Sequence, residues 1–376
     1  MGQKKNILFV IENSAYGGGE KVFSQLIRGL PRDRFAVYCA SLPRGRFYEE
    51  TAGRCAFLPL DLSRRFDLRN IGRLEALLLE HRIDVVHSQG ARADFYCAVA
   101  ASRAGVKAVA TVAMPVEGFD VCYLKKKIYS LLYSFAEKRL AGVITVSGTL
   151  RDALVSRHGL PPERVALIPN PVDTAEFDHS NFDAGPLIEK FGLRGRLVLG
   201  ALGRLEWQKG YPYLIDAVRI LTGKDPELKE KLVCLIGGAG RLETQLKRLC
   251  AEAGVAGNVV FCGEVAPKEF LSAVDIFVMP SLLEGQPLAL LEAMAMAKPI
   301  VATDIPGIND TAVSGSEALL VPPKDPERLA AALAELVRDH ARAAGLGRNA
   351  LLKAGAYGVA PYIDRHVAVY AKVLGI

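Results

Sequence analysis

Short apolar runs alternate with longer segments of helical spacing, and this alternation constrains the fold more than any other feature. The expected strands of the first half are rich in Val, Ile and Leu and span 7–12, 37–42, 84–87, 108–114, 143–147 and 166–169. Apolar residues in the intervening segments recur with the period of a helix. Strands that alternate with helices form parallel sheets covered on both faces, so the first half is predicted to be an α/β domain.

The alternation begins afresh in the second half of the chain. The strands expected there span 197–202, 232–237, 259–263, 276–281, 300–303 and 319–321. The polar stretch 174–185 follows an N-P-V-D run and interrupts either periodicity, so it is the expected linker. The sequence therefore predicts two parallel-sheet α/β domains, at 1–180 and 181–360, and a final amphipathic helix within 361–376.

The composition is that of a globular chain. With 376 residues, 50% hydrophobic and 23% charged, the chain is long enough for two cores. No apolar run has the length of a membrane-spanning helix, and residues 1–12 resemble a basic tip before a core strand instead of a signal peptide. The seven cysteines show no C-x-x-C spacing, so neither a disulfide framework nor a zinc site is expected. A cytoplasmic location follows as the expectation.

Positive charge is concentrated in the first part of the sequence. Residues 1–150 hold 22 Lys and Arg against 14 Asp and Glu, a balance of +8 within the total of +6. The chain has no motif typical of nucleic-acid binding, so no nucleic-acid partner is expected. Segment 121–133 mixes three lysines with aromatic and aliphatic residues, and it would contact an anionic membrane together with Arg44, Arg46, Arg64, Arg65 and Arg69. A core helix with a solvated basic edge explains the same segment equally well.

Glycine-rich turns follow several of the expected strands. Ligands of open parallel sheets bind beyond the carboxyl ends of strands, where loops lead into helix N-termini. Gly17, Gly18 and Gly19 follow the first strand and would let the backbone approach a phosphate or sugar closely, an interpretation favoured over a flexible connection. Gly237 opens a similar turn, for which ligand binding and ordinary loop structure remain equal alternatives.

Two cations stand five residues apart after the first strand of the second half. Arg204 would form forked hydrogen bonds with a diphosphate, and Lys209 would act as a point charge. A solvated surface loop is the alternative.

The run 280–297 combines a turn with an apolar helix. Pro287 suits the first position of the helix, which places Glu284 in the preceding turn at the end of a strand. Residues 288–297 are apolar except for Glu292, whose buried carboxylate needs donors. Ribose hydroxyls or structural donors would both satisfy it.

Taken together, these motifs resemble family 4 of the retaining glycosyltransferases, which have two Rossmann-like domains facing each other across a cleft, the GT-B architecture. The resemblance covers nearly the whole chain, and its motifs are E-x7-E, G-R-L…K-G, I-P-N-P-V-D and K-P-I-V-A-T-D, at 284–292, 203–210, 168–173 and 298–304. It implies that Arg204 and Lys209 hold the donor diphosphate, that Glu284 contacts the transferred sugar and that Glu292 binds the ribose. It also assigns Leu288, Gly237 and the turn at 17–19 to the nucleotide site, and packs the final helix on the first domain.

The sequence departs from the family pattern at three places. Ala113 or Met114 stands where many relatives carry a His, and His87 is a candidate substitute, although a packed core His is the commoner explanation. Gln286 and Pro287 replace a frequent Phe-Gly pair, and Pro306 and Asp310 stand where Gly and Glu are frequent. These departures concern recognition of the sugar more than of the diphosphate.

The resemblance implies transfer of a sugar from a UDP or GDP sugar to a lipid-linked or saccharide acceptor in bacterial surface polysaccharide or lipopolysaccharide synthesis. The resemblance also implies that no metal is needed, and no D-x-D motif occurs to suggest one; no cofactor other than the donor is expected. An anionic membrane surface is an open partner, which would place the protein at the inner face of the cytoplasmic membrane. A non-catalytic sugar-nucleotide-binding protein and a sugar-nucleotide epimerase are the alternatives.

Overall fold

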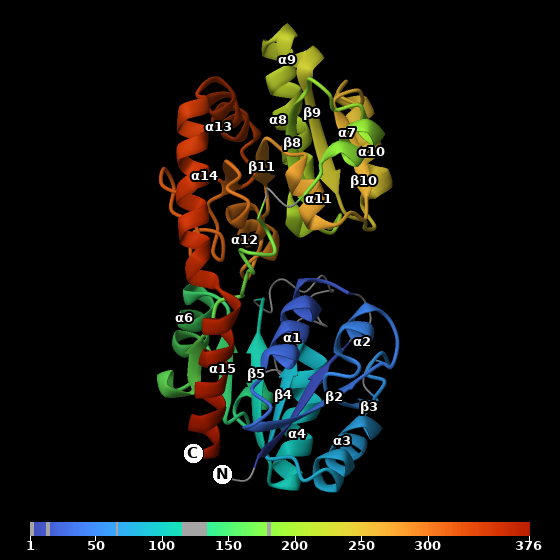
Figure 1. The fold of residues 1–376 in the computed structure, drawn as a ribbon, viewed down its shortest axis with the longest axis vertical. Helices are drawn as coiled ribbons and strands as arrows, with labels where there is room; N and C mark the ends of the chain where they lie inside the picture. The colour runs from blue at the N-terminus through green and yellow to red at the C-terminus, as the bar shows by residue number, and fades with distance from the viewer. Residues whose placement is uncertain (1–3, 13–15, 65–66, 115–133, 179–181) are drawn as a thin grey trace. The chain divides into compact units, whose positions relative to one another are not determined.

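The structure is a computed structural model that describes residues 4–12, 16–64, 67–114, 134–178 and 182–376 (Figure 1). Contacts divide the chain into two compact units. The first unit comprises Met1–Pro171 and Val359–Ile376, and the second comprises Val172–Gly358. The chain thus passes into the second unit within the N-P-V-D run at 170–173 and returns to the first for its last helix.

The first unit contains a seven-stranded parallel sheet with the order β3-β2-β1-β4-β5-β6-β7 (Figure 1). Its strands are β1 (Lys5–Ile11), β2 (Phe35–Ser41), β3 (Ala56–Pro59), β4 (Val85–Gln89), β5 (Lys107–Val112), β6 (Gly142–Thr145) and β7 (Val165–Leu167). The helices of this unit are α1 (Gly18–Gly29), α2 (Arg46–Thr51), α3 (Arg69–Glu80), α4 (Ala91–Ala104), α6 (Gly148–Ser156) and α15 (Val359–Leu374).

The second unit contains a six-stranded parallel sheet with the order β10-β9-β8-β11-β12-β13. Its strands are β8 (Leu197–Leu202), β9 (Leu232–Gly237), β10 (Val259–Gly263), β11 (Ile276–Met279), β12 (Ile300–Thr303) and β13 (Leu319–Val321). Its helices are α7 (Gly185–Phe191), α8 (Tyr211–Lys224), α9 (Pro226–Lys231), α10 (Glu243–Glu252), α11 (Pro267–Ser272), α12 (Leu288–Ala295), α13 (Pro326–Arg338) and α14 (His340–Ala354).

Alternation along buried strands places a hydrophobic core on each face of the second sheet. In β9, Leu232, Cys234 and Ile236 belong to one core cluster, whereas Val233 and Leu235 belong to the other. Successive side chains of a strand point to opposite faces, so a run that is apolar throughout needs helices on both sides. The prediction of two parallel-sheet α/β domains is therefore confirmed.

Strand β3 has no counterpart among the strands that the sequence predicts. It has four residues, lies at the edge of the sheet, and leaves Ala56 and Pro59 exposed. The run 55–60 is apolar, but it is short and contains Pro59, and a proline within such a run argues against a strand unless the strand lies at an edge.

Helix α15 belongs to the first unit, where Tyr362, Ile363, His366, Val367 and Tyr370 are buried. Tyr370 Oη lies 2.6 Å from His87 Nδ1 at the centre of this unit.

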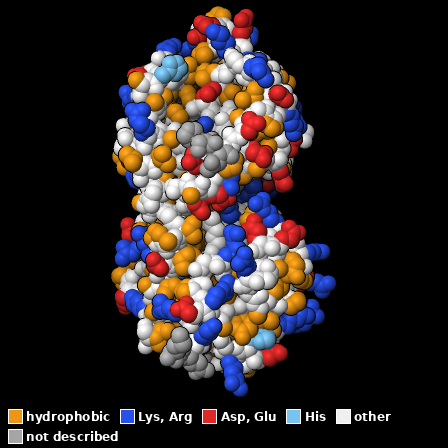
Figure 2. Space-filling model, viewed as in Figure 1, with side chains coloured by type: hydrophobic (Ala, Val, Ile, Leu, Met, Phe, Trp, Pro, Cys, Tyr) orange, Lys and Arg blue, Asp and Glu red, His pale blue; other side chains and the backbone are white. Residues whose placement is uncertain are grey.

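Among the described residues, no helix is long and apolar enough to cross a bilayer. Figure 2 shows numerous Lys and Arg side chains on the visible face of the first unit, interspersed with acidic and apolar ones.

Candidate functional site

The direction of strand order reverses between β8 and β11, which are neighbours at the centre of the second sheet. Because all strands of this sheet are parallel, the loops that follow β8 and β11 leave from the same edge. Ligands of open α/β sheets bind outside the carboxyl ends of strands at such a reversal. The sequence-predicted residues Arg204, Lys209 and Glu284 all lie in these two loops.

Lys209 and Glu284 form an ion pair at this edge. Lys209 Nζ donates to Glu284 Oε1 at 2.7 Å, and Ser281 Oγ donates to the same oxygen at 2.7 Å. The side chain of Glu284 is 5% exposed and that of Lys209 is 22% exposed. An ammonium group has three N–H donors, and the contact with Glu284 uses one of them. Lys209 is thus fixed in place and retains donors for an anion.

The two loops are also joined through their backbones. Gly210 has φ +64°, and a Cβ at this position would lie 2.0 Å from the carbonyl oxygen of Pro280. Leu282 N donates to the carbonyl oxygen of Gln208 at 2.6 Å, and Thr303 Oγ1 donates to that of Ser281 at 2.5 Å. Only glycine fits this close approach, so the position of Lys209 depends on Gly210.

Arg204 is exposed at the start of the loop after β8. No hydrogen bond or ion pair of the Arg204 side chain is found within the described part of the chain. The backbone just before Arg204 is held by Tyr211, whose Oη donates to the carbonyl oxygen of Gly203 at 3.0 Å. The structure therefore brings Lys209 and Glu284 together but leaves Arg204 in solvent at the same edge.

Glu292 lies in the second turn of α12 and is 5% exposed. Leu288, one turn earlier, is half-buried and packs against the core of the second unit. Residues four apart on a helix share a face, so Leu288 and Glu292 form one surface of α12. The helix begins one residue later than predicted, with Pro287 as its N-cap in an extended conformation.

The glycine turn after β9 packs against the loop after β8. Gly238 has φ +123°, and a Cβ at this position would lie 2.1 Å from the carbonyl oxygen of Gly203. A Cβ at the buried Gly237 would lie 2.8 Å from Leu202 Cδ1. Packing alone thus accounts for both glycines, and the assignment of Gly237 to the nucleotide site stays a prediction.

Gln286 and the loop 306–310, two places where the sequence departs from the family pattern, pack against each other. Gln286 is buried, and its Nε2 donates to Thr311 Oγ1 at 3.2 Å. A Cβ at Gly307, which has φ +84°, would lie 2.2 Å from the carbonyl oxygen of Gly285. The side chain of Gln286 therefore supports the loop that carries Glu284.

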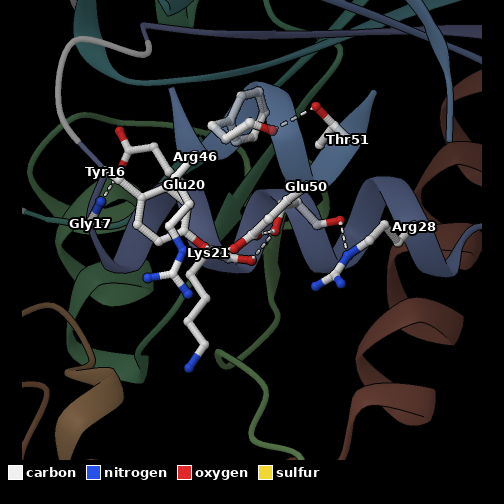
Figure 3. Close-up of polar contacts among 10 residues, drawn as sticks. Tyr16, Gly17, Glu20, Lys21, Arg28, Arg46, Glu50 and Thr51 are labelled. Carbon is white, nitrogen blue, oxygen red and sulfur yellow. Dashed lines mark hydrogen bonds and ion pairs between the residues drawn. The ribbon is translucent and has the colours of Figure 1, made fainter. Parts of the chain in front are cut away.

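The first unit has an equivalent reversal between β1 and β4, and the predicted glycine turn lies beside it. Gly17 is the N-cap of α1, and its N–H donates to Glu20 Oε2 at 2.9 Å (Figure 3). A Cβ on Gly19 would lie 2.7 Å from Nε2 of Gln89, at the end of β4. Gly18 begins α1 between them. The turn is thus close to the edge where a ligand of this unit would bind.

His87 is a core residue and not a substitute for the missing family His. Its side chain is completely buried, its Nε2 lies 2.8 Å from Thr111 Oγ1, and burial lowers its pKa well below the usual value. Ala113 and Met114 are half-buried beyond the end of β5.

Two parts of the predicted basic surface, segment 121–133 and Arg65, lie outside the described residues. Arg69 pairs with Asp67 at 2.7 Å, and Arg46 pairs with Glu50 at 3.0 Å.

Among the described residues, no group of three or more His, Cys, Asp or Glu side chains is arranged to hold a metal ion.

Ser281, Thr303 and Tyr211 support the site but were not predicted from the sequence. Ser281 stands three residues before Glu284, a spacing at which a hydroxyl reaches a carboxylate within one turn. The roles of Thr303 and Tyr211 depend on contacts with carbonyl oxygens of other loops, for which the sequence carries no local signal.

The fold and these two sheet edges define a protein of the GT-B class. The solved structure of Anabaena HepE in complex with UDP-glucose superposes with a TM-score of 0.85 at 20% identity, covering 98% of this chain and 99% of that one. The lipopolysaccharide outer core galactosyltransferase WaaB, in its apo form, gives a TM-score of 0.73 at 15% identity, covering 98% and 99%.

Family comparisons identify the chain more closely. A family described as Glycosyltransferase Family 4 matches residues 16–176, and one described as Glycosyl transferases group 1 matches residues 196–339. The UDP-Gal:alpha-D-GlcNAc-diphosphoundecaprenol alpha-1,3-galactosyltransferase of Escherichia coli is 28% identical over 335 residues, 86% of this chain and 85% of that protein. Several other curated relatives are matched over only 43 to 62% of their own length. The chain belongs to the family 4 glycosyltransferases.

Proposed function

We propose that this glycosyltransferase moves a sugar from a nucleoside-diphosphate sugar of the UDP or GDP type to a lipid-linked or saccharide acceptor. We further propose that it retains the configuration of the transferred carbon and needs no metal ion. The observation that carries the proposal is the Lys209–Glu284 pair, 2.7 Å across, at the strand reversal of the second unit. A cation fixed beside a buried carboxylate at such an edge suits a ligand with a diphosphate next to a polyhydroxyl group.

Each predicted residue has a distinct task in this proposal. Lys209 and Arg204 bind the diphosphate and stabilise the charge that develops on it as the bond to the sugar breaks. The acceptor hydroxyl attacks from the same face, and its proton leaves with the nucleoside diphosphate. Glu284 accepts hydrogen bonds from the sugar and Glu292 from the ribose, while Leu288 and Gly237 line the nucleotide site.

The names of relatives supply the substrate classes to test. The Escherichia coli relative is named for transfer from UDP-galactose to a sugar linked to diphosphoundecaprenol. The HepE structure contains UDP-glucose, and WaaB is named for the lipopolysaccharide outer core. UDP sugars are therefore the first donors to test, with a diphosphate-linked lipid saccharide as acceptor. Such an acceptor would bring the enzyme to the inner face of the cytoplasmic membrane.

A thermal-shift panel of UDP, GDP and ADP sugars tests the donor. A ligand that binds only the folded protein stabilises it by about 2.7 kcal/mol at a concentration one hundred times its dissociation constant. We expect a UDP sugar to raise the melting temperature of the wild type, and this shift to be lost in Glu292→Gln. Glu230→Gln is the matched control, because Glu230 is an exposed acid of the same unit.

The same donor then serves in a transfer assay with and without acceptor. We expect release of free nucleoside diphosphate that requires the acceptor, persists in EDTA, and gives a product with the anomeric configuration of the donor. Turnover of the donor without acceptor would instead indicate an epimerase or hydrolase. Stabilisation by none of the donors would contradict the proposal.

A further inference from the structure

The carboxylate of Glu50, at the end of α2, collects three donors from three parts of the first unit (Figure 3). Tyr16 Oη donates to Glu50 Oε1 at 2.7 Å, and Ser24 Oγ of α1 donates to Oε2 at 2.7 Å. Arg46 Nε donates to Oε1 at 3.0 Å from within α2. The Arg46 guanidinium also lies 4.6 Å from the centre of the Tyr16 ring.

These contacts favour the ionised form of Glu50. Burial works to raise the pKa of this carboxyl, but the hydrogen bonds from Ser24, Tyr16 and Arg46 outweigh burial and hold its pKa below the usual value. Burial and the hydrogen bond to Glu50 raise the pKa of Tyr16, so its hydroxyl keeps the proton that it donates. Hydrogen bonds to an ionised acceptor are roughly twice as strong as neutral ones.

The hydrogen bond between Tyr16 and Glu50 is important because Tyr16 immediately precedes the glycine turn. Gly17, Gly18 and Gly19 have no side chains, and glycine loses more conformational freedom on folding than any other residue. On the far side of the turn, Gly19 packs closely against Gln89, because a Cβ on Gly19 would lie 2.7 Å from Gln89 Nε2. On the N-terminal side of the turn, the first residue with a side chain is Tyr16, and its hydroxyl is hydrogen-bonded to Glu50.

We propose that Glu50 is a positioning residue of the transferase, which fixes the glycine turn at the N-terminus of α1 by binding Tyr16 and Ser24. The inference rests on the proposed function in one respect, the assignment of this turn to the transfer reaction. Glu50 belongs to no motif of the sequence, and its carboxylate acts on the reaction only through the turn.

Two substitutions and their combination test the proposal. Glu50→Gln replaces an ionised acceptor of three hydrogen bonds with an amide whose nitrogen cannot accept any, and Tyr16→Phe removes one donor while keeping the ring. We expect Glu50→Gln to lower kcat/KM for the acceptor by about tenfold to a hundredfold, the effect of a small misplacement in an active site. We expect a smaller loss in Tyr16→Phe, and no further loss when it is added to Glu50→Gln. Glu49→Gln, on the exposed neighbour in α2, is the matched control and should behave as wild type.

Two further measurements separate positioning from general damage. The dissociation constant for UDP should change less than kcat/KM for the acceptor does, because Lys209 and Arg204, which bind the diphosphate in the proposed function, belong to the second unit. Amide hydrogen exchange at residues 16–20 should accelerate at least tenfold in Glu50→Gln, while the strands of the first sheet exchange as in the wild type. If Glu50→Gln does not fold, the same comparison is made on Tyr16→Phe.

The outcomes distinguish this inference from the proposed function. A wild type that binds and turns over no donor, together with faster exchange of the turn in Glu50→Gln, would sink the proposed function and support the positioning contact. Unchanged exchange at 16–20, or unchanged kcat/KM in an active enzyme, would overturn the inference itself. Additive losses in the double variant would also overturn it, because residues that act through one contact do not add.

Discussion

At the scale of single residues, the Lys209–Glu284 pair is better explained by ligand binding than by stability. Desolvating two charges often costs more than their attraction returns, and apolar replacements of buried pairs are frequently as stable. The Glu284 side chain is only 5% exposed, so its charge is largely removed from water. We therefore expect the charge of Glu284 to serve in ligand binding.

Replacing Lys209 should therefore affect activity and folding together. We expect Lys209→Ala to lower kcat/KM by about a hundredfold to a thousandfold, the range for loss of one group that stabilises developing charge. The change also leaves the Glu284 carboxylate with Ser281 as its remaining donor among the contacts described above, so the melting temperature of the second unit should fall. Steady-state kinetics and calorimetry measure the two effects.

Lys247→Ala is the control for this experiment. Lys247 pairs with Glu243 at 2.7 Å on the surface of α10, with 56% of its side chain exposed, and exposed pairs contribute about 0.5 kcal/mol. Activity of Lys209→Ala equal to that of Lys247→Ala would show that the pair has no part in transfer.

Sequence patterns identified the charged residues of this site but not their contacts. The run around Glu284 and the cations after the first strand of the second half were recognisable because unusual residue types stand where strands end. The Lys209–Glu284 contact joins residues 75 apart, and its 2.7 Å distance follows from the way the two loops pack. Glu50 was not predicted, because a lone acid in a short helix resembles any solvated surface residue.

At the scale of elements, glycines decide how closely loops approach each other. Gly210 and Gly192 both adopt left-handed backbone conformations, with φ +64° and +62°. A Cβ at Gly210 would lie 2.0 Å from the Pro280 carbonyl oxygen, whereas one at Gly192 would have no neighbour within 4 Å. The two positions therefore separate the cost of the backbone conformation from the cost of a steric clash.

We expect Gly192→Ala to lower the free energy of unfolding of the second unit by about 1 kcal/mol, from the left-handed conformation alone. Gly210→Ala should cost about 3 kcal/mol or more, because the loops after β8 and β11 must separate as well. Calorimetric melting of the two variants checks the difference. Equal losses would mean that the loop after β8 adjusts freely and does not hold Lys209 in place.

The predicted strands also show which elements of the fold a sequence pattern can reveal. Central strands were recognisable because both of their faces are buried, and that requires a continuous apolar run. In β9 the predicted and observed bounds agree, at Leu232–Gly237. Strand β3 at the edge was missed for another reason: the apolar run 55–60 that contains it is short and includes Pro59, and a proline within such a run argues against a strand.

At the scale of the whole molecule, three buried groups in the core of the first unit, His366, His87 and Asp94, make stability depend on pH. Burial lowers the pKa of His366 to about 4 and that of His87 well below its usual value. The unfolded chain then binds more protons than the folded chain between about pH 6.5 and pH 4, so these residues make the unit less stable as pH falls. Acid should therefore loosen the contact between α15 and the first sheet.

Asp94 of α4 acts in the opposite direction. Burial raises its pKa to about 7, with Glu137 adding repulsion, although Ser88 Oγ donates to its carboxyl at 2.7 Å. Between about pH 4 and pH 7 the folded chain holds a proton here that the unfolded chain releases, so this residue destabilises the unit as pH rises through that window. The two effects partly cancel in the wild type and flatten its pH profile.

Asp94→Asn should remove the loss of stability with rising pH that Asp94 causes. It should leave the loss of stability on acidification that His87 and His366 cause. The amide oxygen still accepts from Ser88, and no buried charge forms at high pH. We expect the variant to match the wild type near pH 4 and to exceed it by up to about 4 kcal/mol above pH 7, the value of a shift of about three pKa units. Its stability should then fall steeply on acidification, because the contributions of His87 and His366 are no longer opposed. Thermal unfolding of the first unit from pH 4 to pH 8 measures this, with Asp152→Asn on the exposed face of α6 as the control. A constant difference across that range would show that Asp94 is ionised in the folded protein throughout.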